Sequence, residues 1–280
     1  MKKPVILMRA SLAEEKELLT AKKYFDVYES RCAIPENSLV IPRFSYLPFP
    51  KEFEEDMKYK NCDVINTYRQ HRYIADLSNW YQDLEDITPK TWFRFEDVPK
   101  HCGPVVLKGE TNSKKYSWHS HMYAENWDAA NKVCSNLMMD SLIGTQNIYI
   151  REYVPLKTFD YDVTGIPITE EYRFFIFDGK IIASGFYWSS HCELLEDKKL
   201  DINPDKVPRE FIQDIIDRVG KNSRFFVVDV ARTQTPYNPL YNQIGLGDWI
   251  VIELNDGMMS GISENDPNVL YSNMKDVLTK

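Results

Sequence analysis

The sequence predicts an α/β unit at the front of the chain and an α+β region behind it. Short apolar runs alternate with helical patterns over roughly the first 85 residues, which is the order expected of a small parallel sheet. Further along, two apolar runs flank Asp178-Gly179, a pair that supplies the positive φ angles of a type I′ turn. Such a turn joins antiparallel strands, so a sheet of a different kind is expected in the rear region.

The front unit begins with a buried strand at residues 4–8. Ser11-Leu12-Ala13-Glu14 has the pattern of a capping box that opens a helix through about Tyr24. Further short strands are expected at residues 25–29, 38–41 and 63–66. No Gly-x-Gly-x-x-Gly follows the first strand, so a dinucleotide site there has no support.

A domain junction is expected at Ile87 to Thr91, because Pro89 biases the residue before it away from the helical region. Arg69 to Leu84 has the spacing of one helix before this break. The predicted domains are therefore residues 1–86, 87–151 and 152–280. The rear elements expected are strands at 105–108 and 147–153, a helix at 126–139, a hairpin at 172–188, a helix at 211–219, and strands at 225–230 and 249–254. The helix at 126–139 is expected to bury Ala129, Ala130, Val133, Leu137 and Met138.

Composition and charge exclude several classes of protein. Of the 280 residues, 43% are hydrophobic and 27% charged, which is ordinary for a globular protein. The formal net charge is −8 with no long basic run, which argues against a general nucleic-acid binder but leaves room for a single bound nucleotide. The five cysteines form no C-x-x-C pair and suit a reducing compartment. No apolar stretch of about 18 residues exists. We therefore expect a cytoplasmic protein without a membrane partner.

Three oxygen-bearing side chains near the end of the chain are typical of a magnesium site. Asp229 lies in one apolar strand, and Glu253 and Asn255 lie in the next. Side chains alternate faces along a strand, so Glu253 and Asn255 point the same way, and an antiparallel neighbour could bring Asp229 to that face. Two carboxylates and an amide oxygen suit Mg²⁺ that bridges nucleotide phosphates. For any one of these residues, an ordinary polar position at a strand end is the simpler interpretation.

Cationic and hinge residues precede this acidic set. Lys108 ends an apolar strand and enters a polar loop, where its ammonium group could meet phosphate oxygens. Glu152, Tyr153 and Val154 end another strand, where backbone groups could pair with an adenine edge. Each feature is common by itself, and their order along the chain is the informative part.

That order resembles the ATP-grasp superfamily, which includes D-alanine–D-alanine ligase and its relatives. The resemblance covers roughly residues 65–262, and its most specific element is the close of the motif at Glu253-Leu254-Asn255-Asp256-Gly257. The nearest likeness is to a compact clade found in bacteria and their phages. The hairpin from Glu171 to Gly179 also looks like that of a eukaryotic cell-division-cycle family whose members assemble a translation initiation factor. The resemblance implies two α+β subdomains that clamp ATP behind a small α/β domain.

The resemblance also implies roles for individual residues. ATP and Mg²⁺ would be the cofactors. The phosphates would contact Lys108 and Arg173, with Lys114 and Lys115 adding charge from a loop that has fewer glycines than usual. Glu152, Tyr153 and Val154 would bind adenine, Glu171 would bind ribose, and Asp229, Glu253 and Asn255 would bind magnesium. The family's earlier lysine is missing, and either Arg69 or Arg72 would replace it.

The activity implied is ligation of a carboxylate to an amine or thiol through an acyl phosphate. Arg173 would stabilise the transferring phosphoryl group, and Arg232 is a candidate contact for the substrate carboxylate. The partners would be ATP and a pair of small-molecule or peptide substrates that the sequence does not identify. One alternative is an ATP-binding assembly factor that grips a protein partner, and another is a phosphotransferase.

Two further readings carry less weight. His101, Cys102, His119 and His121 invite a zinc interpretation, but no second close pair completes a tetrahedral set. Cys134 lies in a predicted helix and is better explained as a core residue than as a nucleophile. The sequence has no Gly-x-x-x-x-Gly-Lys-Ser/Thr, which excludes the standard P-loop.

Overall fold

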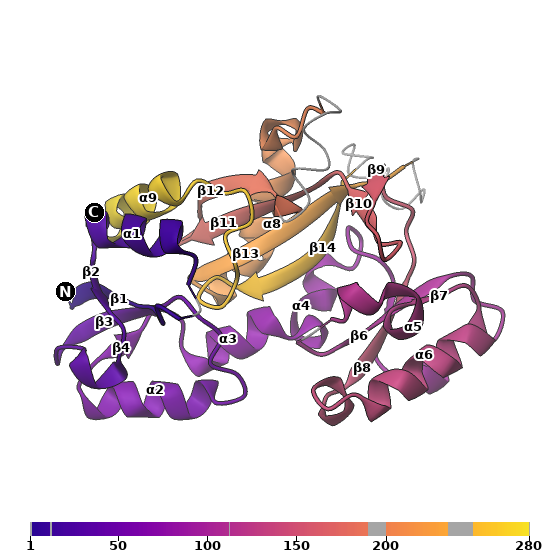
Figure 1. The fold of residues 1–280 in the computed structure, drawn as a ribbon, viewed down its shortest axis with the longest axis horizontal. Coiled ribbons are helices and arrows are strands. Elements are labelled where there is room, and N and C mark those ends of the chain that lie inside the picture. The colour runs from indigo at the N-terminus through magenta and orange to yellow at the C-terminus, as the bar shows by residue number, and fades with distance from the viewer. Residues whose placement is uncertain (1, 12, 112, 190–199, 235–248, 280) are drawn as a thin grey trace.

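The computed structural model describes residues 2–279 except 12, 112, 190–199 and 235–248 (Figure 1). Three regions are visible along the chain. A small unit at the N-terminus lies at the lower left of Figure 1, a region of short strands and helices lies at the lower right, and a large sheet lies above and between them. No helix in the described ranges is long and apolar enough to cross a bilayer.

The N-terminal unit is a parallel sheet with the strand order β2-β1-β3-β4, which confirms the predicted α/β class. Its strands are β1 (Lys3–Leu7), β2 (Asp26–Tyr28), β3 (Ser38–Pro42) and β4 (Asp63–Val64), and its helices are α1 (Glu15–Tyr24) and α2 (Pro50–Tyr59). The chain places β2 on one side of β1 and β3 on the other. The carboxyl edge between β1 and β3 is therefore the switch point of this sheet.

The predicted capping box at the start of α1 is wrong. The helix begins at Glu15, and its cap residue Glu14 makes no side-chain capping bond. The Ala13 N–H donates to the Arg9 carbonyl at 2.9 Å, so a separate turn occupies this segment before the helix starts. A complete capping box does exist elsewhere, between Thr67 and Gln70.

The helix predicted over Arg69 to Leu84 is two helices, α3 (Tyr68–Ala75) and α4 (Leu77–Leu84). Asp76 breaks the run with φ −103° and ψ 114°, and its side chain accepts a hydrogen bond from the Ser78 N–H at 2.9 Å. Aspartate competes for backbone donors in this way, which explains why it caps the second helix instead of continuing the first.

The middle region is an antiparallel sheet with the order β5-β8-β6-β7. The strands are β5 (Thr91–Trp92), β6 (Val105–Gly109), β7 (Tyr123–Ala124) and β8 (Ile148–Glu152), and the helices are α5 (Trp118–His121) and α6 (Trp127–Met139). Helix α6 buries Ala130, Val133 and Leu137 as predicted, but Met138 is 67% exposed. Past the end of the helix the chain turns back, and the fully buried Ile143 joins this part of the core.

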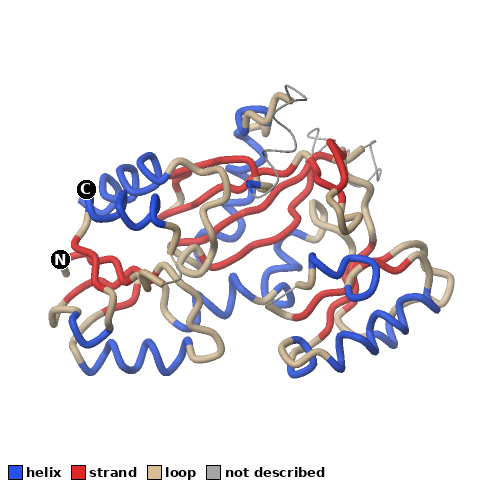
Figure 2. Tube along the Cα trace, in the orientation of Figure 1, coloured by secondary structure: helices blue, strands red, loops and turns tan. Residues whose placement is uncertain are grey.

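The large C-terminal sheet has the antiparallel order β12-β11-β13-β14. Its strands are β11 (Glu171–Phe177), β12 (Lys180–Phe186), β13 (Phe225–Arg232) and β14 (Trp249–Asp256), accompanied by the small hairpin of β9 (Thr158–Tyr161) and β10 (Pro167–Thr169) and by helices α8 (Arg209–Val219) and α9 (Pro267–Thr279). The turn between β11 and β12 has positive φ at Asp178 (44°) and Gly179 (75°), which confirms the predicted hairpin. Figure 2 shows the strands in red and the helices in blue.

The last helix packs against the first domain. Glu17 on α1 accepts a hydrogen bond from the Tyr271 hydroxyl of α9 at 2.7 Å, and it also pairs with Arg43 at 2.9 Å. One apolar core joins the N-terminal sheet to a face of the C-terminal sheet and to α9, so the two chain ends lie close together in Figure 1. The boundaries at residues 86 and 151 stay predictions.

Candidate active site

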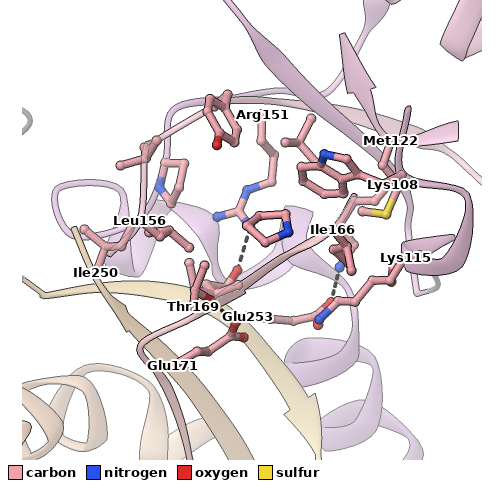
Figure 3. A pocket seen from close by; sticks show the side chains of 18 of the residues that line it. Lys108, Lys115, Met122, Arg151, Leu156, Ile166, Thr169, Glu171, Ile250 and Glu253 are labelled. Carbon is pink, nitrogen blue, oxygen red and sulfur yellow. Dashed lines mark hydrogen bonds and ion pairs between the residues drawn. The ribbon is translucent and has the colours of Figure 1, made fainter. Parts of the chain in front are cut away.

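A cavity lies between the middle sheet and the C-terminal sheet (Figure 3). Its walls come from β6, β8 and the segment after β8 on one side, and from β10, β11 and β14 on the other. Predicted site residues line it at both ends: Glu152, Tyr153 and Val154 at the hinge, and Lys108, Glu171 and Glu253 at the polar end. The fold therefore brings together segments separated by about half of the chain.

The hinge segment offers one backbone donor. The N–H groups of Glu152 and Tyr153 already donate to the carbonyls of Lys90 (2.8 Å) and Pro104 (2.9 Å). Among the described residues, the N–H of Val154 has no acceptor, although Val154 is only 5% exposed. A buried donor without a partner is costly, so a ligand atom that accepts from Val154 would be stabilised here.

Lys108 and Glu253 meet across the cavity. The Lys108 ammonium group lies within hydrogen-bonding distance of Glu253 Oε1, and Figure 3 shows Lys115 reaching toward the same carboxylate. Burial acts to raise the pKa of Glu253, but the charges of Lys108 and Lys115 and a hydrogen bond from Asn255 outweigh it and lower that pKa to about 2. Glu253 is thus held as an anion, with Asn255 bonded beside it.

Arg173 and Asp229 form the second ion pair of the site. They lie opposite each other in the β11–β13 pairing, and both Arg173 Nε and Nη2 donate to Asp229 at 2.8 Å. Arg173 also donates to the Gly261 carbonyl at 2.8 Å and lies over the ring of Tyr187. Both side chains are buried, with Asp229 only 1% exposed. Neither of these two residues lines the cavity.

The predicted magnesium residues share one face of the sheet. Asp229 lies opposite Glu253 in the antiparallel pairing of β13 and β14, and Asn255 is two residues further along the same strand. In the described ranges, no three His, Cys, Asp or Glu side chains are grouped closely enough to hold a metal ion on their own. Two carboxylates with an amide oxygen fit Mg²⁺ only if phosphate oxygens complete the set, as is usual for Mg²⁺ in nucleotide sites.

Glu171 is a buried carboxyl group with unused bonding capacity. It is 3% exposed, its Oε2 accepts from the Thr169 hydroxyl at 3.2 Å, and its Oε1 has no partner in the described structure. Burial raises the pKa of Glu171 to about 7, partly opposed by the charge of Lys115. A ligand hydroxyl could donate to the free oxygen, which is compatible with the predicted contact to ribose.

Of the two loop lysines, Lys115 enters the cavity and Lys114 does not. Lys115 donates to the Tyr187 hydroxyl at 2.5 Å and lies over the rings of Tyr187 and Trp188. Burial favours the neutral amine, but Tyr187, Glu171 and Glu253 outweigh it, so the pKa of Lys115 is raised and its charge is kept. Lys114 instead pairs with Asp140 at 2.7 Å. Tyr187 follows the end of β12, and no sequence motif predicts its place in the site.

The remaining candidates lie away from the cavity lining. Arg232 has its Nη1 3.8 Å from Glu170 Oε2. Arg72 pairs with Glu110 (2.8 Å) and Asp76 (3.1 Å), and Arg69 is exposed. Neither arginine lines the cavity, and the replacement of the missing lysine by one of them stays a prediction.

Arg151, for which the sequence predicts no role, also lines the cavity. It is 7% exposed, and its Nη2 donates to the Thr88 hydroxyl at 2.7 Å. The only sequence feature that could have indicated a role for Arg151 in the site is its position directly before the hinge.

Comparison with known families decides which family this fold represents. The family model described as ATP-grasp domain, R2K clade family 3, matches residues 98–274, which is more than half of the chain. The chain belongs to this ATP-grasp family. The predicted superfamily and fold class are thereby confirmed.

Solved ATP-grasp structures share the fold at low sequence identity. D-alanine–D-alanine ligase from Bacillus anthracis, in complex with ATP, superposes with a TM-score of 0.59 at 12% identity, covering 100% of this chain and 95% of the ligase. A RimK domain ATP-grasp protein from Sphaerobacter thermophilus gives 0.56 at 13% identity, covering 96% and 98%. The ATP-grasp ligase PsnB with its minimal precursor gives 0.56 at 12%, covering 100% and 99%. No curated protein matches the sequence significantly.

Proposed function

We propose that this ATP-grasp chain is an ATP- and Mg²⁺-dependent ligase that joins a carboxylate to an amine or thiol. The observation that supports it is the balanced charge at one end of the cavity. Two cations (Lys108 and Lys115) and two acids (Glu171 and Glu253) line this end, and the buried Arg173–Asp229 ion pair lies next to them on β11 and β13. Val154 of the hinge lines the opposite end, where its N–H could donate to a nucleotide base.

The proposed roles follow from this geometry. Val154 would bind the base, Glu171 the ribose, and Lys108, Lys115 and Arg173 the phosphates. Asp229, Glu253 and Asn255 would hold Mg²⁺, which supplies charge stabilisation to the transferring phosphoryl group when bound. Lys114 and Arg232 stay candidate contacts for phosphate and for the substrate carboxylate, with Lys114 now paired to Asp140 and Arg232 at the end of β13 near Glu170. A cytoplasmic location stays a prediction.

The reaction proceeds in two balanced steps. A substrate carboxylate oxygen bonds to the γ-phosphorus of ATP as the bond to the bridging oxygen breaks, giving an acyl phosphate and ADP. An amine or thiol then bonds to the acyl carbon, the carbon–oxygen bond to phosphate breaks, and the nucleophile loses a proton. The cations Lys108 and Arg173 would stabilise the negative charge that moves between these oxygens.

The test measures ADP formed from ATP and Mg²⁺ with pools of carboxylic acids and amines, with hydroxylamine added to trap an acyl phosphate as a hydroxamate. A ligase should form ADP and hydroxamate only when an acid substrate is present. Glu253→Gln should lower that rate by roughly a hundredfold or more. Glu96→Gln, at an exposed position on the middle region, is the matched control and should leave the rate unchanged.

Other outcomes discriminate between the rival functions. A stable phosphorylated product without hydroxamate would identify a phosphotransferase. Nucleotide binding without turnover for any acid, with capture of one protein partner, would indicate the assembly-factor alternative. Equal ADP formation by wild type and Glu253→Gln would contradict the metal assignment.

A further inference from the structure

A second pocket lies in the N-terminal unit, outside the cavity described above. It is formed by two arginines and a group of aromatic side chains, and its principal members are Arg9, Arg31, Phe44, Tyr46, Phe49 and Phe53. We call it the N-terminal pocket.

The position of this pocket follows from the topology of the parallel sheet. Arg9 follows β1, and Phe44 to Tyr46 follow β3, so both segments emerge at the same carboxyl edge. Strands β2 and β3 lie on opposite sides of β1, so the connections diverge here and leave a crevice. Ligands of open α/β sheets bind in such crevices.

One wall of the N-terminal pocket is an aromatic surface. Tyr46 stacks on Phe53 with ring centroids 4.6 Å apart, and Phe44 meets Tyr46 edge to face at 5.8 Å. Phe53 and Phe44 are buried, but Phe49 is 61% exposed at the rim. A large exposed ring beside buried rings can bury apolar ligand surface. Little side-chain entropy is lost on binding, since the wall is already packed.

The same pocket has one uncompensated positive charge. Arg31 Nη1 pairs with Asp56 at 2.5 Å. The guanidinium carbon of Arg9 lies 4.8 Å from the centroid of the Phe44 ring, and no carboxylate of the described residues pairs with Arg9. One cation left over at an aromatic surface matches a ligand with one negative charge and an apolar body. The planar guanidinium favours a carboxylate, which it can bind with two parallel bonds.

We propose that the N-terminal pocket binds a monocarboxylate with an aromatic or branched aliphatic body, its carboxylate on Arg9 and its body on Phe49 and Tyr46. The Tyr46 hydroxyl donates to Met258 Sδ at 3.5 Å, so one wall of the pocket contacts the segment that follows β14. This binding goes beyond the ligase activity proposed above. Binding itself does not depend on that function.

The test uses the full-length chain and two probes of equal shape, 3-phenylpropanoate and its neutral amide, measured by calorimetry at pH 7. The acid should bind about tenfold more tightly than the amide, because only the acid can pair with Arg9. Arg9→Gln should remove this preference, and Arg9→Lys should restore part of it. Phe49→Ala, at an exposed position, should weaken both probes.

The matched control is Arg94→Gln, which removes an exposed arginine of the middle region and should leave both affinities unchanged. Equal binding of acid and amide, or unchanged binding by Arg9→Gln, overturns the proposal, as does no binding of the acid at millimolar concentration. Mg²⁺·ATP binding is measured on the same samples. Binding of the acid without binding of nucleotide would contradict the proposed ligase function and support the proposed carboxylate pocket. Binding of nucleotide without binding of the acid would contradict the carboxylate pocket alone.

Discussion

Arg173 and Asp229 face each other across β11 and β13 and are joined by two hydrogen bonds of 2.8 Å. The cation proposed to contact phosphate therefore already holds a carboxylate proposed to contact magnesium. Lys108 and Glu253 have the same relationship on the other side of the site. A bound nucleotide and metal ion would therefore replace the ion pairs that these residues form with each other. This replacement affects both the stability of the fold and the affinity for ligands.

Asp229→Asn is expected to destabilise the fold as well as the metal site. The substitution leaves the Arg173 guanidinium buried without its counter-charge, which costs about 3 kcal/mol in comparable buried pairs. The measurement is the free energy of unfolding in urea. Asp178→Asn is the control, because Asp178 pairs with Arg224 through two similar bonds (2.9 and 2.8 Å) that are partly exposed. An exposed pair is worth less than about 1 kcal/mol. Equal losses in the two variants would contradict the expected role of burial.

Affinity for ATP is expected to depend strongly on Mg²⁺. If the phosphates pair with Lys108 and Arg173, the carboxylates of Glu253 and Asp229 lose their counter-charges. Bound Mg²⁺ would replace those counter-charges. By linkage, each ligand then strengthens the other, and a typical coupling is about tenfold. Calorimetric titration of ATP with Mg²⁺ and with EDTA measures the ratio directly. Lys108→Met should reduce ATP affinity and also reduce this ratio, whereas a ratio near one in the wild type would show that the ion pairs do not oppose binding.

The raised pKa of Glu171 predicts a pH-dependent stability. Its pKa rises from 4.5 to about 7 in the folded chain, so the folded state binds a proton that the unfolded state releases between these values. Stability from this group is therefore full below pH 4.5 and is lost as pH rises through 7. Glutamine cannot ionise, so Glu171→Gln does not lose this stability as pH rises. The variant should have a higher free energy of unfolding than wild type at pH 8, by up to about 3 kcal/mol.

The check on Glu171 is the difference in unfolding free energy between Glu171→Gln and wild type, measured at pH 5 and at pH 8. The difference should shrink towards zero at pH 5, where Glu171 of the wild type is protonated in the folded chain. A difference that is the same at both pH values would show that Glu171 does not titrate in this range.

Much of the fold was predictable because its signals are local. Runs such as Phe225 to Val230 have few polar residues to expose, and Asp178-Gly179 fixes its turn by backbone conformation alone. Two-residue strands such as β5 and β7 carry no such pattern, since their pairing depends on neighbours distant in sequence. The break at Asp76 was missed because the apolar spacing continues through it while a side chain competes for the backbone.

The candidate site also contains residues that a local pattern predicts and residues whose position depends on distant parts of the chain. Alternation along a strand was enough to expect Glu253 and Asn255 on one face, and the pairing register adds Asp229. The loop lysines could not be separated from sequence, because adjacent side chains in a loop have no fixed direction. The contacts that separate them are Asp140 for Lys114 and Tyr187 for Lys115, and both come from other parts of the fold.

The two capping-box patterns give a direct test of how far a local motif predicts structure. Thr67 Oγ1 accepts from the Gln70 N–H at 3.3 Å, and the Gln70 side chain accepts from the Thr67 N–H at 2.9 Å. Thr67→Ala should therefore lower the unfolding free energy by about 1 kcal/mol, measured as a shift of the urea midpoint at constant slope. Ser11→Ala should change it by less than about 0.5 kcal/mol, because α1 has no side-chain cap and an exposed substitution away from such a feature has little effect. A loss at Ser11 as large as that at Thr67 would mean that Ser11 stabilises the start of α1 in solution.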